Sequence, residues 1–186
     1  MEPLKIAVLG DCGSGKSAFV CHFVTGDFHP RLDPTIEDIY RKPFEVRNQP
    51  ILLEILDTAT PDCTWGVPYH EMYIKNNIAF VLLYSITSKT SFENLGAWND
   101  NIKKMKESTH PITLVGSKAD LEEKRQVSYE EGLSFAERIG ATFWEVSSKT
   151  GKDISAVFVD LSERSLDNKV YKFKSNATFR GGCELI

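Results

Sequence analysis

A glycine-rich segment near the start of the chain carries residues that could bind a phosphate. Directly after the apolar run Leu4–Leu9 the chain reads Gly10-Asp11-Cys12-Gly13-Ser14-Gly15-Lys16-Ser17, the pattern G-x-x-x-x-G-K-S. Glycines let successive backbone N–H groups converge on an anion, and a helix expected to begin near Lys16 points its positive end there. The Lys16 ammonium can bind phosphate oxygens, and the Ser17 hydroxyl can ligate Mg²⁺. The predicted phosphate contacts are Asp11, Cys12, Gly13, Ser14, Gly15, Lys16, Ser17 and Ala18.

Composition limits the kinds of protein that this chain can be. Its 186 residues suit a single domain, and a net charge of −4 argues against a nucleic-acid-binding protein, which would carry a basic patch. The cysteines at positions 12, 21, 63 and 183 lack the spacing of a metal site, and Met1-Glu2-Pro3 does not resemble a secretory signal. No apolar run reaches the roughly 18 residues that a membrane span needs. We therefore expect a monomeric cytosolic protein with reduced thiols and no nucleic-acid partner.

Apolar runs alternate with helical patterns along the chain, which predicts an α/β fold. The expected architecture is a doubly wound, mostly parallel sheet of six strands, with one antiparallel edge strand and helices on both faces. The predicted strands are Leu4–Leu9, Ile39–Val46, Ile51–Leu56, Ile78–Tyr84, Ile112–Val115 and Phe143–Val146, with a turn at Arg47–Pro50. Helices are expected near residues 16–25, 88–107, 128–139 and 153–166. We assign residues 1–167 to this domain and residues 168–186 to a flexible basic tail.

Four further segments follow the phosphate loop in a fixed order: Asp33–Asp38, Asp57–Ala59, Gly116–Leu121 and Ser147–Thr150. Each follows a predicted strand or the first helix, at the edge where open α/β sheets bind ligands. Together with the phosphate loop these segments resemble the Ras family of small GTPases, and within it they are most similar to the Rap subgroup. The resemblance spans residues 4–165 and the last four residues.

This resemblance implies a molecular switch that binds GTP or GDP with Mg²⁺ and hydrolyses GTP. It gives catalytic roles to Lys16 and Thr35, and it implies that Ser17, Thr35 and Asp57 hold the magnesium ion. The carboxylate of Asp120 can accept from both the N1–H and the amino group of guanine, which gives guanine specificity a physical cause. Further implied nucleotide contacts are Phe28, Pro34, Thr60, Ser117, Lys118, Leu121, Ser147, Ser148 and Lys149.

The resemblance also implies partners. Effector proteins with a Ras-binding-type domain would add a strand at a segment formed by Asp33, Ile36, Glu37, Asp38, Ile39 and Tyr40. An exchange factor and an activating protein would act as regulators. The terminal Cys183-Glu184-Leu185-Ile186 fits the C-a-a-X prenylation box, with Cys183 as the lipidated residue. A prenyl group and the basic tail predict attachment to the cytoplasmic face of the plasma membrane or an endomembrane, with a cytosolic pool.

The chain departs from the family pattern at positions that matter for chemistry. Thr60 and Pro61 stand where the family has a glycine that senses the γ-phosphate and a glutamine that orients water, so we expect slow hydrolysis. Cys12 replaces a glycine and would crowd an incoming arginine finger. Ser117 replaces an asparagine that bridges the base and the phosphate loop, which predicts weaker binding or faster exchange. The alternative is a non-catalytic interaction module that holds one nucleotide state or binds nucleotide weakly. A small P-loop kinase is disfavoured, because nothing resembles an arginine-rich lid.

Overall fold

A six-stranded sheet forms the centre of the protein, as seen in a computed structural model that describes residues 2–29, 37–58, 68–106 and 110–168. The strand order is β2-β3-β1-β4-β5-β6, and only the β2–β3 pair is antiparallel. This arrangement confirms the predicted fold class. The strands are β1 (Leu4–Leu9), β2 (Glu37–Val46), β3 (Gln49–Thr58), β4 (Ala79–Ser85), β5 (Ile112–Ser117) and β6 (Thr142–Glu145).

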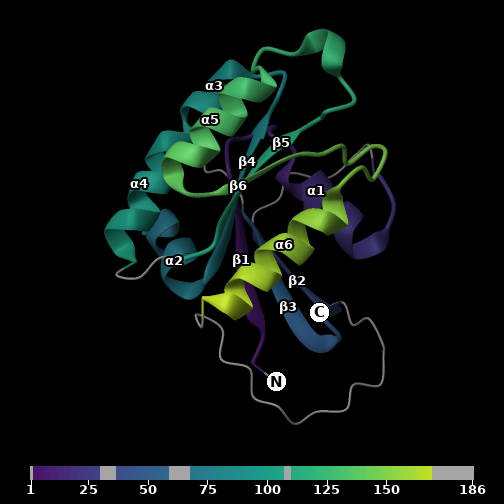
Figure 1. The fold of residues 1–186 in the computed structure, drawn as a ribbon, viewed down its shortest axis with the longest axis vertical. Coiled ribbons are helices and arrows are strands. Elements are labelled where there is room, and N and C mark those ends of the chain that lie inside the picture. The colour runs from purple at the N-terminus through teal and green to yellow at the C-terminus, as the bar shows by residue number, and fades with distance from the viewer. Residues whose placement is uncertain (1, 30–36, 59–67, 107–109, 169–186) are drawn as a thin grey trace.

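Helices cover both faces of the sheet (Figure 1). On one face α1 (Lys16–Thr25) and α6 (Ile154–Asp167) pack together through the stacked rings of Phe23 and Phe158, whose centroids lie 3.8 Å apart. The other face carries α2 (Pro68–Asn76), α3 (Lys89–Glu93), α4 (Leu95–Met105) and α5 (Tyr129–Ile139). A short 3₁₀ turn spans Glu122–Lys124. None of the described helices combines the length and the apolar character that crossing a bilayer would require.

The helix predicted over residues 88–107 is in fact two helices. The first, α3, ends at Glu93, and α4 begins at Leu95, so that Asn94 is at once the C-cap of α3 and the N-cap of α4. Asn94 and Gly96 are both poor helix formers, and the break therefore falls where intrinsic helix propensity is lowest. The helix predicted near 128–139 is confirmed as α5, with a capping box formed by Ser128 and Glu131.

Three other local features differ from the sequence prediction. The β2–β3 connection is a two-residue turn in which Arg47 and Asn48 have φ of 51° and 59°, so β3 already begins at Gln49. The last strand, β6, begins and ends one residue earlier than predicted. Helix α2 was not predicted at all. Among its residues 71–76, whose burial the structure describes, only Tyr73 and Ile74 are buried, too few to give a helical period.

Candidate functional site

The glycine-rich loop connects β1 to α1 beside the point where the strand order reverses, since β1 lies between β3 and β4. Gly10 has a φ of +151°, and a Cβ there would lie 2.0 Å from the carbonyl oxygen of Leu83 in β4. Gly15, with a φ of +100°, is the N-cap of α1 and supplies no side-chain cap. The backbone therefore follows a path that only glycine permits, and it leads to a helix N-terminus of the kind that binds anions.

Lys16 is buried inside this loop. Its Nζ donates to the carbonyl oxygens of Gly10 and Asp11, both at 2.9 Å, and only 6% of the residue is exposed. Burial lowers the pKa of Lys16, while the nearby charge of Asp57 acts in the opposite direction. Burial removes water from the Lys16 ammonium, and the surrounding groups make up for this loss only in part. A bound anion would therefore stabilise its positive charge further. The loop thus presents a fixed cation where a phosphate is expected.

Asp57 lies next to this loop at the carboxyl end of β3. It pairs in register with Val8 of β1, it is fully buried, and the hydroxyl of the next residue, Thr58, donates to the Val8 carbonyl oxygen at 2.7 Å. Within the described part of the chain no group of three or more His, Cys, Asp or Glu side chains forms a metal cage. Proteins commonly hold Mg²⁺ with one carboxylate, a hydroxyl and phosphate oxygens. The donors Asp57 and Ser17 therefore fit Mg²⁺ together with a bound phosphate.

The loop after β5 is hydrogen-bonded to the glycine-rich loop over more than 100 residues of sequence. Ser117 Oγ donates to the Ser14 carbonyl oxygen at 2.5 Å, and Lys118 Nζ donates to the Gly13 carbonyl oxygen at 2.8 Å. Lys118 adopts a φ of 63°, a left-handed conformation that is uncommon for non-glycine residues. Although serine is shorter than asparagine, the Ser117 side chain still bonds to the phosphate loop. The weaker binding or faster exchange of nucleotide expected from this serine stays a prediction.

The loop after β6 closes the same end of the sheet. Ser147 Oγ donates to Asp120 Oδ1 at 2.6 Å, and the Ala119 N–H donates to the Val146 carbonyl oxygen at 3.0 Å. Ser147 and Ser148 are buried, whereas Asp120 and Lys149 are exposed. An ionised carboxylate accepts about four hydrogen bonds, so Asp120 keeps the capacity to accept two more donors from a base.

Comparison with known proteins shows the family in which this set of loops occurs. A profile of the Ras family matches residues 5–167. The chain is also 36% identical, over an alignment of 201 positions, to the Ras-like protein rasU of Dictyostelium discoideum. That alignment covers 98% of this chain and 93% of rasU. This chain belongs to the Ras family. It is therefore a GTP-binding protein of the small-GTPase type.

Two residues that sequence reasoning missed support the loops of this Ras-family domain. The ring of His22 on α1 lies behind the turn after Ser147, where Gly151 has a φ of +77° and a Cβ would lie 2.7 Å from His22 Nε2. Asn94 Nδ2 donates to Asp11 Oδ2 at 2.6 Å, which joins the α3–α4 junction to the phosphate loop. Neither residue belongs to a motif, and both act across long sequence separations, so no local pattern could have indicated them.

The remaining predicted site residues are placed as follows. Phe28, after α1, exposes 39% of its surface, and the N–H of Leu121 donates to the Lys118 carbonyl oxygen at 2.8 Å. Ala18 lies half-buried in the first turn of α1, and Cys12 is exposed. The predicted effector residues from Glu37 to Tyr40 lie on β2. The predictions that fall outside the described residues are Asp33, Pro34, Thr35, Ile36, Thr60 and Cys183.

Proposed function

We propose that this protein is a Ras-type switch that binds GTP or GDP with Mg²⁺, hydrolyses GTP slowly and recruits effectors through β2. The observation that supports nucleotide binding best is the convergence of three loops at one edge of the sheet. Lys16, Lys118 and Ser147 come from separate loops of the chain, and the hydrogen bonds Ser117–Ser14, Lys118–Gly13 and Ser147–Asp120 hold these loops together. Phe28 adds an exposed aromatic ring that can pack against a base.

In this proposal each described residue has a separate task. Lys16 binds phosphate oxygens and offsets the negative charge that develops on these oxygens during hydrolysis. Ser17 and Asp57 hold Mg²⁺, whose contribution is to neutralise phosphate charge. Asp120 reads guanine, because an adenine base presents no matching pair of donors there. The replacement of the family's Gly-Gln by Thr60-Pro61 removes the glutamine that orients water in the family, which is the reason for proposing slow hydrolysis.

The nucleotide in freshly purified protein tests this proposal. After denaturation, chromatography of the supernatant should find mostly GTP, because the protein binds nucleotide but converts it slowly. Retained GDP would contradict slow hydrolysis, and an empty site would favour a non-catalytic interaction module over a switch. The matched variant carries Thr60→Gly and Pro61→Gln together. Its single-turnover phosphate release should be faster than that of the unmodified protein by about 10- to 100-fold.

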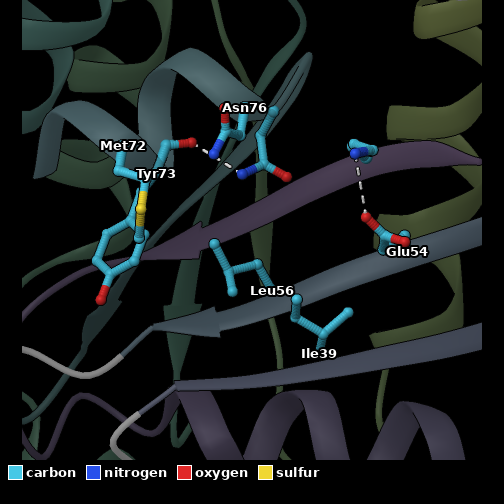
Figure 2. Close-up of a pocket in the computed structure, with 8 residues that line it drawn as sticks. Ile39, Glu54, Leu56, Met72, Tyr73 and Asn76 are labelled. Atoms are coloured by element: carbon cyan, nitrogen blue, oxygen red, sulfur yellow. Dashed lines mark hydrogen bonds and ion pairs between the residues drawn. The ribbon is translucent and has the colours of Figure 1, made fainter. Parts of the chain in front are cut away.

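The surface proposed for effectors combines a strand edge with a hollow that both apolar and polar side chains line. Strand β2 is at the edge of the sheet, where its backbone groups can pair with a partner strand, and Ile39 exposes 51% of its surface. Beside it a hollow of about 70 Å³ lies between the sheet and α2. Figure 2 shows Ile39 and Leu56 on the strands and Met72 and Tyr73 of α2 across the hollow. The exposed apolar side chains of Ile39 and Met72, next to a strand at the edge of the sheet, suit a protein partner.

Replacing Ile39 by glutamate tests this surface. A panel of isolated Ras-binding-type domains should include at least one that binds the protein loaded with a non-hydrolysable GTP analogue. Ile39→Glu should weaken that binding about tenfold or more, because it places a charge in the apolar centre of the contact. Leu133→Glu is the control, since Leu133 is also an exposed apolar residue, at 39%, but lies on α5. Equal effects of the two variants in calorimetry would contradict the proposed surface.

A further inference from the structure

The phosphate loop of this protein contains a carboxylate, that of Asp11, which an anion-binding loop would be expected to avoid. The Asp11 backbone is part of the loop itself, because its carbonyl oxygen accepts from Lys16 Nζ at 2.9 Å and from Ser14 Oγ at 2.7 Å. A negative side chain at this position repels a bound phosphate. It is also attracted to the groups that should bind that phosphate, the Lys16 ammonium and the positive end of α1.

The structure shows what holds this carboxylate. Asn94 Nδ2 donates to Asp11 Oδ2 at 2.6 Å, a short hydrogen bond to a charged acceptor. Asn94 is the N-cap residue of the eleven-residue helix α4, and it makes no side-chain cap bond to its own helix. Its side-chain amide N–H donates to Asp11, and this bond places the carboxylate beside the positive end of α4.

The electrostatics of the loop agree with this geometry. The charge of Asp11 acts on Lys16 to raise its pKa, although burial has the larger effect and lowers it. The two groups thus interact even while the carboxylate is bound to Asn94. A carboxylate released from Asn94 would be free to approach the ammonium more closely and to compete with phosphate for it.

We infer that Asn94 is a positioning residue that keeps the Asp11 carboxylate out of the phosphate site. The inference rests on the proposed nucleotide binding and adds a connection from the α3–α4 junction to the phosphates. When Asn94 is lost, the carboxylate competes with the nucleotide. The competition is stronger against GTP than against GDP, because the additional phosphate adds negative charge near the loop.

Nucleotide affinities of four variants test this inference. Asn94→Ala should weaken GDP binding by about 5- to 10-fold, and binding of a non-hydrolysable GTP analogue by a larger factor. Asn94→Asp should have a greater effect still, because it removes the amide donor and faces Asp11 with a like charge. Asp11→Ala should bind slightly more tightly than the unmodified protein. Adding Asp11→Ala should suppress the effect of Asn94→Ala, since no carboxylate is then left to compete.

Controls separate this inference from a structural role and from the proposed function. Asn101→Ala, two turns further along α4, should leave both affinities unchanged, and melting temperatures without nucleotide should show that every variant folds. The inference is overturned if Asn94→Ala weakens GDP and the GTP analogue by the same factor. It is also overturned if adding Asp11→Ala does not suppress the effect of Asn94→Ala. An unmodified protein that binds neither nucleotide would instead refute the proposed function.

Discussion

An Asp120→Asn substitution is expected to lower the affinity for GDP by about 10²- to 10⁴-fold, and to raise the affinity for xanthosine diphosphate. Guanine presents two donors on this edge, N1–H and the amino group, and a carboxylate can accept from both. Xanthine presents one donor and one acceptor, which match the oxygen and the NH₂ of an amide. Ser147 Oγ donates to one carboxylate oxygen at 2.6 Å and can hold the amide oxygen in the same place. Fluorescence titration with both diphosphates measures the exchange of specificity.

The control for this substitution is Glu123→Gln, which makes the same chemical change at an exposed residue three positions further along. It should leave both affinities unaltered. Loss of GDP affinity without any gain for xanthosine diphosphate would show that the base does not meet Asp120 in the proposed way. A similar loss in both variants would point to the general charge of this surface and not to base reading.

The sequence was sufficient to predict the sheet and the identity of the loops. β1, β4 and β5 are buried on both faces, so each gives a continuous apolar run that marks a parallel strand. The phosphate loop was predictable as well, because its glycines and Lys16 lie within eight consecutive residues. Both features could be predicted because the residues that form them are close together in the sequence.

The features that escaped prediction depend on tertiary contacts or on weak local signals. The break at Asn94 was hidden because the apolar positions of α3 and α4 continue one helical period. The β2–β3 turn needs a positive φ at both central residues, and Arg47 gives no sign of this, although Asn48 does. The bond from Ser117 to Ser14 joins residues 103 positions apart, and no pattern along the chain could indicate it. The motifs therefore indicated candidate residues for the site, but not the contacts that hold these residues in place.

Lys16→Met is expected to reduce nucleotide affinity by about 10²- to 10³-fold, because it removes a buried cation from its phosphate partners. In the unmodified protein, affinity should fall as pH rises through the Lys16 pKa, since only the protonated ammonium attracts phosphate. Burial lowers that pKa, so the fall should begin at a lower pH than for an exposed lysine. The methionine variant should show no such fall. Titrations of GDP at several alkaline pH values measure both effects, with the exposed Lys104→Met as a control.

The same substitution should not destabilise the nucleotide-free protein. A lowered pKa means that folding disfavours the charged form of Lys16, so an uncharged side chain of similar length avoids that cost. This gain offsets the loss of the hydrogen bonds from Lys16 to Gly10 and Asp11. The melting temperature without nucleotide should therefore be unchanged or higher for Lys16→Met, even though binding is lost. Lost binding together with an unchanged or higher melting temperature indicates a residue that serves ligand binding at a cost in stability. Near-normal affinity would show that Lys16 does not bind the phosphates. A large fall in melting temperature would show that Lys16 holds the loop together.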